Sequence, residues 1–140
     1  MTETNQAVVL KFIDAMGACD TERAASCLAP DAFTQAMGFG KFAGVRQYAT
    51  IVGTISALKV LLPTGLRPEV KSVIAAADTV VVEWEGHATT RDGAAYNNQY
   101  CMVFRLQDGK IKQVNEYFCN ILADTVLWPL VEKMSAQIPT

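Results

Sequence analysis

Residues 79–120 constrain the fold of this chain more than any other part of the sequence. They contain three long runs rich in β-branched and aromatic residues, TVVVEWEGHATT, AAYNNQYCMVFRLQ and KIKQVNEYFCN. Asp92-Gly93 and Asp108-Gly109 separate these runs, and an Asp-Gly pair in such a place is typical of a β-hairpin turn. The stretch therefore predicts a three-stranded antiparallel meander.

Because successive side chains of a strand point to opposite faces, each of these strands carries two distinct sets. The carboxylates of Glu83 and Glu85 share one face of the first strand with His87. In the third strand, Glu116 shares its face with the aromatic ring of Phe118. Carboxylates among aromatic residues are typical of a partly polar cavity wall, so we expect a domain that bears a pocket.

The chain has 140 residues, of which 51% are hydrophobic and 19% charged. This length suits a single domain over residues 1–140, and the apolar excess must enter a core, a ligand cavity or a subunit interface. A net charge of −2 without a basic cluster speaks against nucleic-acid binding. No apolar run approaches the ~20 residues of a membrane span, and the opening residues, MTETNQ, do not resemble a signal peptide. We therefore expect a cytoplasmic protein without a membrane partner.

The four cysteines form no Cys-x-x-Cys pair; they are Cys19, Cys27, Cys101 and Cys119. With His87 as the one imidazole in the sequence, they do not make a pattern of zinc ligands. We interpret them as free thiols and expect no metal site. Nothing in the sequence brings His87 next to a cysteine, so a catalytic thiolate is not favoured. His87 itself is a candidate general base at the mouth of the pocket.

The other elements are predicted from periodicity. Helices are expected over four segments with apolar residues at helical spacing, residues 4–18, 22–28, 45–58 and 121–137. Pro129 lies in the last segment and should kink or divide it. Two more strands are expected over residues 33–37 and 69–76, and the Pro- and Gly-containing segment 61–68 is a loop that is a candidate rim of the pocket. The order α-α-β-α-β-β-β-β predicts an α+β fold, with helices packed on one face of a mainly antiparallel sheet.

This arrangement resembles the nuclear transport factor 2-like superfamily, which includes ketosteroid isomerases, SnoaL-like polyketide cyclases and limonene-epoxide hydrolases. The local resemblance rests on Y-x-N-x-Y at residues 96–100, F-x-x-x-D-G-K-I at residues 104–111, and the Glu116-Tyr117 pair. It implies a cone-shaped, curved sheet of the cystatin-like kind, with helices closing its open side around an apolar cavity. It also implies a homodimer formed through the outer face of the sheet. The resemblance is specific for fold and not for function, since this fold hosts enzymes and non-enzymes alike.

The resemblance further implies which side chains line the cavity. It places there the carboxylates of Glu83, Glu85 and Glu116. It adds seven candidate substrate-binding residues, Phe12, Tyr48, Asn98, Tyr100, Met102, Phe104 and Phe118. The outer face, toward a second copy, would carry Trp84, Cys101, Val103, Asn115 and Tyr117. Large apolar side chains on such a face are easier to explain in a dimer than in a monomer.

The active-site residues of the enzymes in this superfamily match the residues of this sequence only in part. The base of ketosteroid isomerases falls on Ala36, and their oxyanion-hole tyrosine falls on Phe12, so steroid isomerisation is not expected. Against limonene-epoxide hydrolases, Glu116 and Glu85 match the two carboxylates, but Glu83 stands in place of the arginine between them. No family active site is reproduced in full.

From the residues we expect general acid–base catalysis by Glu116 with Glu85 or Glu83, because two carboxylates in an apolar pocket acquire different pKa values. Asn98 and Tyr100 are candidate hydrogen-bond donors to a substrate carbonyl. The predicted protein is an isomerase, cyclase or hydrolase that acts on a small apolar carbonyl, hydroxyl or epoxide compound. Its chemistry would need neither a metal nor an organic cofactor. The alternative is a non-catalytic ligand-binding or protein-association module of the same fold.

Overall fold

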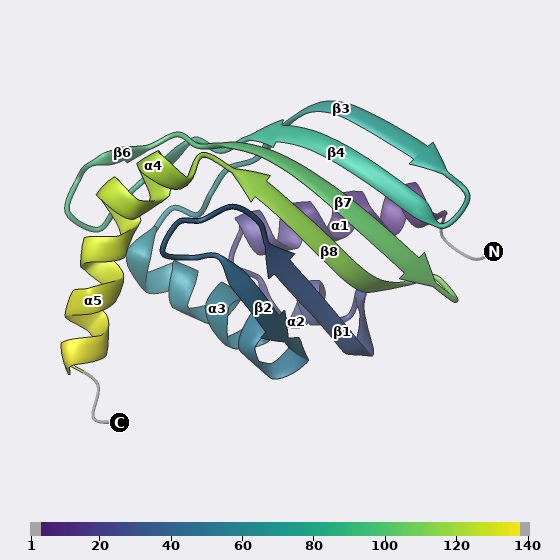
Figure 1. Cartoon of the computed structure of the whole chain (residues 1–140), viewed down its shortest axis with the longest axis horizontal. Coiled ribbons are helices and arrows are strands. Elements are labelled where there is room, and N and C mark those ends of the chain that lie inside the picture. Colours follow the sequence, from purple (N-terminus) through teal and green to yellow (C-terminus); the bar gives the residue numbers. More distant parts are fainter. Residues whose placement is uncertain (1–3, 138–140) are drawn as a thin grey trace.

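The computed structural model describes residues 4–137 as one curved sheet with helices on its concave side (Figure 1). The first half of the chain forms α1 (Asn5–Gly17), α2 (Thr21–Ala25), β1 (Leu28–Ala36), β2 (Gly44–Gln47) and α3 (Tyr48–Leu61). The next elements are β3 (Glu69–Ala76), β4 (Thr79–Glu85), β5 (Ala88–Thr89), β6 (Ala95–Tyr96), β7 (Gln99–Gln107) and β8 (Lys110–Phe118). Six strands pair in the order β2-β1-β8-β7-β4-β3, and only the β1–β8 pair is parallel. The predicted α+β class is confirmed.

The meander is present, and β3 covers the predicted residues 69–76. Its first strand is shorter than predicted because the chain leaves the sheet at Gly86, whose N–H donates to the Asn98 carbonyl over 2.9 Å. A Cβ atom at Gly86 would meet the Leu66 carbonyl oxygen and the Tyr100 ring, each at 3.4 Å. The glycine thus allows a close approach of the chain to the Tyr100 ring. The following residues pair in a separate two-stranded sheet, β5–β6.

The first half of the chain differs from the prediction at two places. The second helix ends at Ala25, because Leu28 already pairs with Ile111 in the parallel β1–β8 ladder. Residues 44–47 form the edge strand β2 on β1, and α3 begins only after it. The apolar residues on both sides of the boundary between β2 and α3 have helical spacing. The prediction from local periodicity therefore missed this strand, which forms only by pairing with β1.

The core lies between the concave face of the sheet and α1. Thr4 caps α1 by accepting a hydrogen bond from the Ala7 N–H over 3.1 Å. The buried face of α1 packs against β4 and β8 and carries Val8, Val9, Phe12, Ile13, Ala15 and Met16. On β4 the inward side chains are Val80, Val82 and Trp84. Because these three side chains face inward, the carboxylates of Glu83 and Glu85 lie on the opposite face of β4. This avoids the cost of transferring charge into the core.

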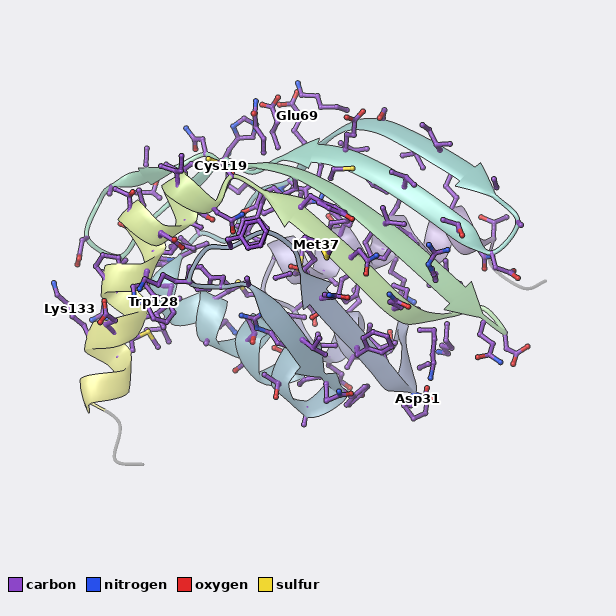
Figure 2. The ribbon with its side chains drawn as sticks, in the orientation of Figure 1. Asp31, Met37, Glu69, Cys119, Trp128 and Lys133 are labelled. Carbon is purple, nitrogen blue, oxygen red and sulfur yellow. The ribbon has the colours of Figure 1, made fainter. Side chains whose placement is uncertain are left out.

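The C-terminal segment is divided into α4 (Asn120–Leu122), the π-helical turn η1 (Ala123–Leu127) and α5 (Trp128–Gln137). Pro129 lies in the first turn of α5, where its missing N–H is not needed, and the wider π turn precedes it. Trp128, labelled in Figure 2, contacts Phe42 edge-to-face with ring centroids 5.4 Å apart and so anchors α5 to the loop after β1. None of the described helices has both the length and the apolar character that crossing a membrane requires.

Candidate functional site

The sheet, α1, α3 and η1 surround a cavity of about 150 Å³. Most of its wall is apolar, with Phe12 and Met16 from α1, Ile51 and Ile55 from α3, and Met102 from β7. Six polar side chains also line it: Thr34, Arg46, Thr54, Tyr96, Tyr100 and Glu116. An apolar hollow with a few polar groups is the usual form of a small-molecule site.

Glu116 is the carboxylate of this cavity. It lies on β8, where its backbone pairs with Met102 of β7 and with Ala36 of β1. The residue keeps some solvent exposure through the cavity, but its carboxylate is crowded by protein, and this burial raises its pKa. Arg46 opposes the shift by lowering the pKa. Because desolvation dominates, Glu116 holds its proton to a higher pH than an ordinary glutamate, a property suited to proton transfer.

Tyr100 forms a second polar point of the wall. Burial raises its pKa well above the usual value, and the neighbouring Tyr96 and Glu116 raise it further. The phenol therefore stays protonated and remains a hydrogen-bond donor. Its ring stacks on Trp84, the residue opposite it in the β4–β7 ladder, with centroids 3.9 Å apart and planes at 8°. This stacking fixes the position of the hydroxyl.

Behind Tyr100 lies a short polar chain. The Tyr96 hydroxyl hydrogen-bonds with that of Tyr100 and accepts a bond of 2.9 Å from Asn98 Nδ2. Burial raises the pKa of Tyr96, while these two hydrogen bonds lower it. Asn98 Nδ2 also donates to the Cys119 carbonyl, and Asn98 Oδ1 accepts from the Gln99 and Cys119 N–H groups. With its amide fully used, Asn98 supports the tyrosines and does not line the cavity, where a contact with substrate was predicted.

The predicted places of Glu83 and Glu85 are also wrong. Both point to the convex side of the sheet, where Glu83 is exposed and accepts a 2.7 Å hydrogen bond from the Ser72 hydroxyl. Trp84, predicted to face a partner subunit, is 1% exposed and lines the cavity. The side chains of β4 alternate between the two faces of the sheet, as predicted. However, the wrong one of these two faces was assigned to the cavity from the sequence. The structure therefore brings neither partner carboxylate near Glu116.

His87 lies on the same convex side, outside the cavity wall. Its Nε2 is 2.9 Å from Glu69 Oε1, and Lys71 Nζ donates to Glu69 Oε2 over 2.9 Å. Figure 2 shows Glu69 pointing away from the helices. Ligand atoms of Glu69, Glu85 and His87 lie within 4.8 Å of one another and form the candidate metal-binding group of the described chain. The lysine and histidine already satisfy the Glu69 carboxylate, so this group is an exposed ion-pair cluster.

Of the other residues predicted to contact the substrate, some line the cavity, and Phe104 and Tyr48 do not. Phe12, Met102 and Phe118 line the cavity, as do Tyr100 and Glu116. Phe104 is fully buried behind the wall and meets Phe12 edge-to-face, with centroids 6.0 Å apart. Tyr48 opens α3 and is half-buried against the core without lining the cavity.

Several wall residues were missed in the sequence, among them Tyr96, Trp84 and Arg46. Tyr96 had a signal, because it alternates with Asn98 and Tyr100 and so shares their face. Trp84 had one as well, since a large aromatic ring between two valines of its own face favours burial. Arg46 had none, because its place depends on the unpredicted strand β2.

The cavity, the curved sheet and the covering helices define a pocket protein of the nuclear transport factor 2-like fold. A family model, the SnoaL-like domain, matches residues 9–114. The chain belongs to the SnoaL-like domain family, as the sequence resemblance predicted. No curated protein matches the chain significantly.

Solved structures share the fold at low sequence identity. A nuclear transport factor 2-like protein of unknown function from Burkholderia pseudomallei superposes with a TM-score of 0.77 at 15% identity, covering 90% of this chain and 98% of that one. A proposed isomerase from Bacillus subtilis gives 0.76 at 18% identity, covering 87% and 91%. TerC, co-crystallised with polyporic acid, gives 0.74 at 21% identity, covering 87% and 96%.

Proposed function

We propose that this protein is a cofactor-independent enzyme that moves a proton within a small apolar carbonyl compound, as an isomerase or cyclase does. The observation that carries the proposal is the position of Glu116, a carboxylate with a raised pKa in the wall of an apolar cavity. A general base works best when its pKa lies near the working pH, and burial shifts a glutamate in that direction.

The single carboxylate favours isomerisation or cyclisation over hydrolysis. Hydrolysis by a carboxylate pair needs one group to activate water and another to protonate the leaving group, and Glu83 and Glu85 lie on the other side of the sheet. An isomerase can work with one group, which removes a proton from carbon and returns it at another position. Glu116 ends such a cycle in the state in which it began.

Tyr100 is the proposed electrophilic partner. Asn98 Nδ2 and the Tyr100 hydroxyl both donate to the Tyr96 oxygen, since both hydrogen bonds lower the pKa of Tyr96 and the second raises that of Tyr100. When a substrate is bound, the Tyr100 hydroxyl turns from Tyr96 to the substrate oxygen, where negative charge develops as Glu116 removes a proton from the adjacent carbon. The ring of Tyr100 is already held by its stack on Trp84, so only the hydroxyl rotates to stabilise that charge.

One structural neighbour supports this class of reaction by its description, and a second was crystallised with a small organic compound. The Bacillus subtilis protein is described as a proposed isomerase, and TerC was co-crystallised with an organic acid. Their low identity leaves the substrate of this chain open, so the test must not depend on one substrate.

The test is proton exchange at carbon. Small aryl ketones are incubated with the protein in heavy water, and deuterium incorporation next to the carbonyl is followed by NMR. We expect Glu116→Gln to slow the exchange at least ~100-fold, in the range that a general base supplies. Glu83→Gln is the matched control, because it makes the same chemical change on the convex side and should leave the rate unchanged.

Two results would count against catalysis. Equal exchange rates for the wild type and Glu116→Gln would remove Glu116 from the mechanism. Ketone binding without any exchange above buffer would favour the alternative, a ligand-binding module.

We also propose a homodimer through the convex face of the sheet. Its support is an apolar group on that face, in which Ile74 is 63% and Tyr117 44% exposed beside Val81, Val103 and Cys101. Burying such a patch against a second copy would remove it from water. We expect sedimentation to give twice the chain mass, and Ile74→Glu to give the monomer. Val60→Glu, an equivalent change at an exposed position on α3, should leave the dimer intact.

A further inference from the structure

Arg46 is a cation in the wall of an otherwise apolar cavity. It lies on the edge strand β2, opposite Thr34 of β1, and both side chains reach the cavity. Its Nη2 donates to the Phe42 carbonyl over 2.8 Å. Within the described part of the chain, no carboxylate lies close enough to form a salt bridge with it. Most of the five N–H donors of the guanidinium thus remain for other partners.

Glu116 faces the same cavity from the other side of β1. In the ladders, Glu116 of β8 pairs with Ala36, and Ala36 in turn pairs with Gly44 of β2. Between Glu116 and the edge of the sheet, this row therefore contains only Ala36, whose side chain is a methyl group, and Gly44, which has no side chain. Arg46 lies two residues from Gly44 on β2, in the next row on the same face, and its charge lowers the pKa of Glu116 without forming an ion pair. The floor between the two side chains is open.

We propose that this space takes the acidic group of the ligand, and that the cavity binds small apolar carboxylates with the anion on Arg46. This inference deepens the proposed function, on which it rests for the reacting end of the ligand at Glu116. A planar guanidinium matches a carboxylate with two parallel hydrogen bonds, a geometry that a neutral ligand cannot copy.

The charges of the cavity favour an acid over a neutral ligand. A neutral apolar molecule that fills the cavity would displace water from the Arg46 guanidinium without replacing its hydrogen bonds, which lowers the affinity. A carboxylate replaces that water with charge-assisted bonds. Glu116 makes no ion pair with Arg46 that an anion would have to displace, and Tyr96 and Tyr100, the other titratable groups at this place, stay neutral.

The test compares acids with their amides by isothermal titration calorimetry. The probes are hexanoate, phenylacetate and 1-naphthylacetate, each beside its uncharged carboxamide. We expect the wild type to bind at least one acid more tightly than its amide, and Arg46→Gln to weaken that acid about tenfold or more while changing the amide about twofold or less. Arg105→Gln on the convex side is the matched control and should leave all affinities unchanged.

The outcomes separate this inference from the proposed catalysis. Glu116→Gln should abolish proton exchange yet keep acid binding, so a failure of catalysis leaves the Arg46 result readable. Arg46→Lys, which keeps the charge but loses the two-pronged geometry, should recover part of the affinity and confirms a folded pocket. The inference is overturned if no acid in the series binds the wild type more tightly than Arg46→Gln. Equal losses for acid and amide would overturn it as well, since they would assign Arg46 a structural role.

Discussion

Arg46 and Glu116 face one cavity from strands that flank β1, and the small side chain of Ala36 leaves the floor between them open. Burial raises the pKa of the carboxylate and the guanidinium lowers it, so Arg46 limits how far burial shifts the protonation of Glu116. This pair, with Tyr100 beside it, is the basis of the following predictions.

Replacing Glu116 should change how stability depends on pH. In the unfolded chain its pKa is ordinary, whereas burial raises it in the folded protein. Between these two values the folded state binds more protons, so the wild type loses stability as pH rises, by at most about 1.4 kcal/mol per pH unit. Glu116→Gln has no proton to lose, and its stability relative to the wild type should grow as pH rises above the ordinary glutamate pKa and level off above the raised pKa of the folded protein.

Urea titrations of both proteins across that range measure this difference. Glu83→Gln, the same substitution at an exposed position on the convex side, is the matched control. A constant difference between Glu116→Gln and the wild type at every pH would show that Glu116 titrates normally.

Replacing the Tyr100 hydroxyl should affect turnover more than binding. Tyr100→Phe keeps the ring on Trp84 but removes the donor aimed at the developing charge. We expect the rate of proton exchange at saturating ketone to fall about 100-fold, with the half-saturating concentration changed severalfold at most. Tyr117→Phe, on the exposed face, should match the wild type. If Tyr100→Phe raised only the half-saturating concentration, the hydroxyl would be a binding group without a role in catalysis.

Asn98 should be essential for stability, unlike its neighbour in the chain. Its amide makes four hydrogen bonds, two of them to the Cys119 backbone and one to Tyr96. Asn98→Ala leaves buried partners unsatisfied, and we expect a loss of roughly 2–4 kcal/mol in the free energy of unfolding. Asn97→Ala, at an exposed position, should stay within about 0.5 kcal/mol of the wild type. A small effect at Asn98 would indicate that water replaces the amide.

Filling the floor of the cavity should block the ligand while preserving the fold. Ala36→Leu places a larger apolar side chain between Arg46 and Glu116, where space is open. We expect acids and amides alike to lose about tenfold or more in affinity, with a change in stability of about 1–2 kcal/mol in either direction. Ala94→Leu, at an exposed loop position, is the control for added apolar volume. Unchanged affinity in Ala36→Leu would place the ligand elsewhere in the cavity.

Much of the fold could be predicted, because its signals are local. The Asp-Gly turns and the alternation of the strands predict the meander, and β3 begins and ends at the expected residues. Thr4 caps α1 as its side-chain chemistry predicts. Alternation also grouped Glu116 with Phe118, and the structure places both in the cavity wall.

The sequence by itself determined which side chains share a face, since the period of two is a property of the extended backbone. Only the tertiary structure decided which face of β4 meets the cavity, and it buried Trp84 while leaving Glu83 in water. Alternation is symmetric between the faces, and the choice depends on what packs against them. The place of Arg46 was likewise beyond the sequence, because β2 exists only by pairing with β1, and β1 by lying beside β8, far along the chain.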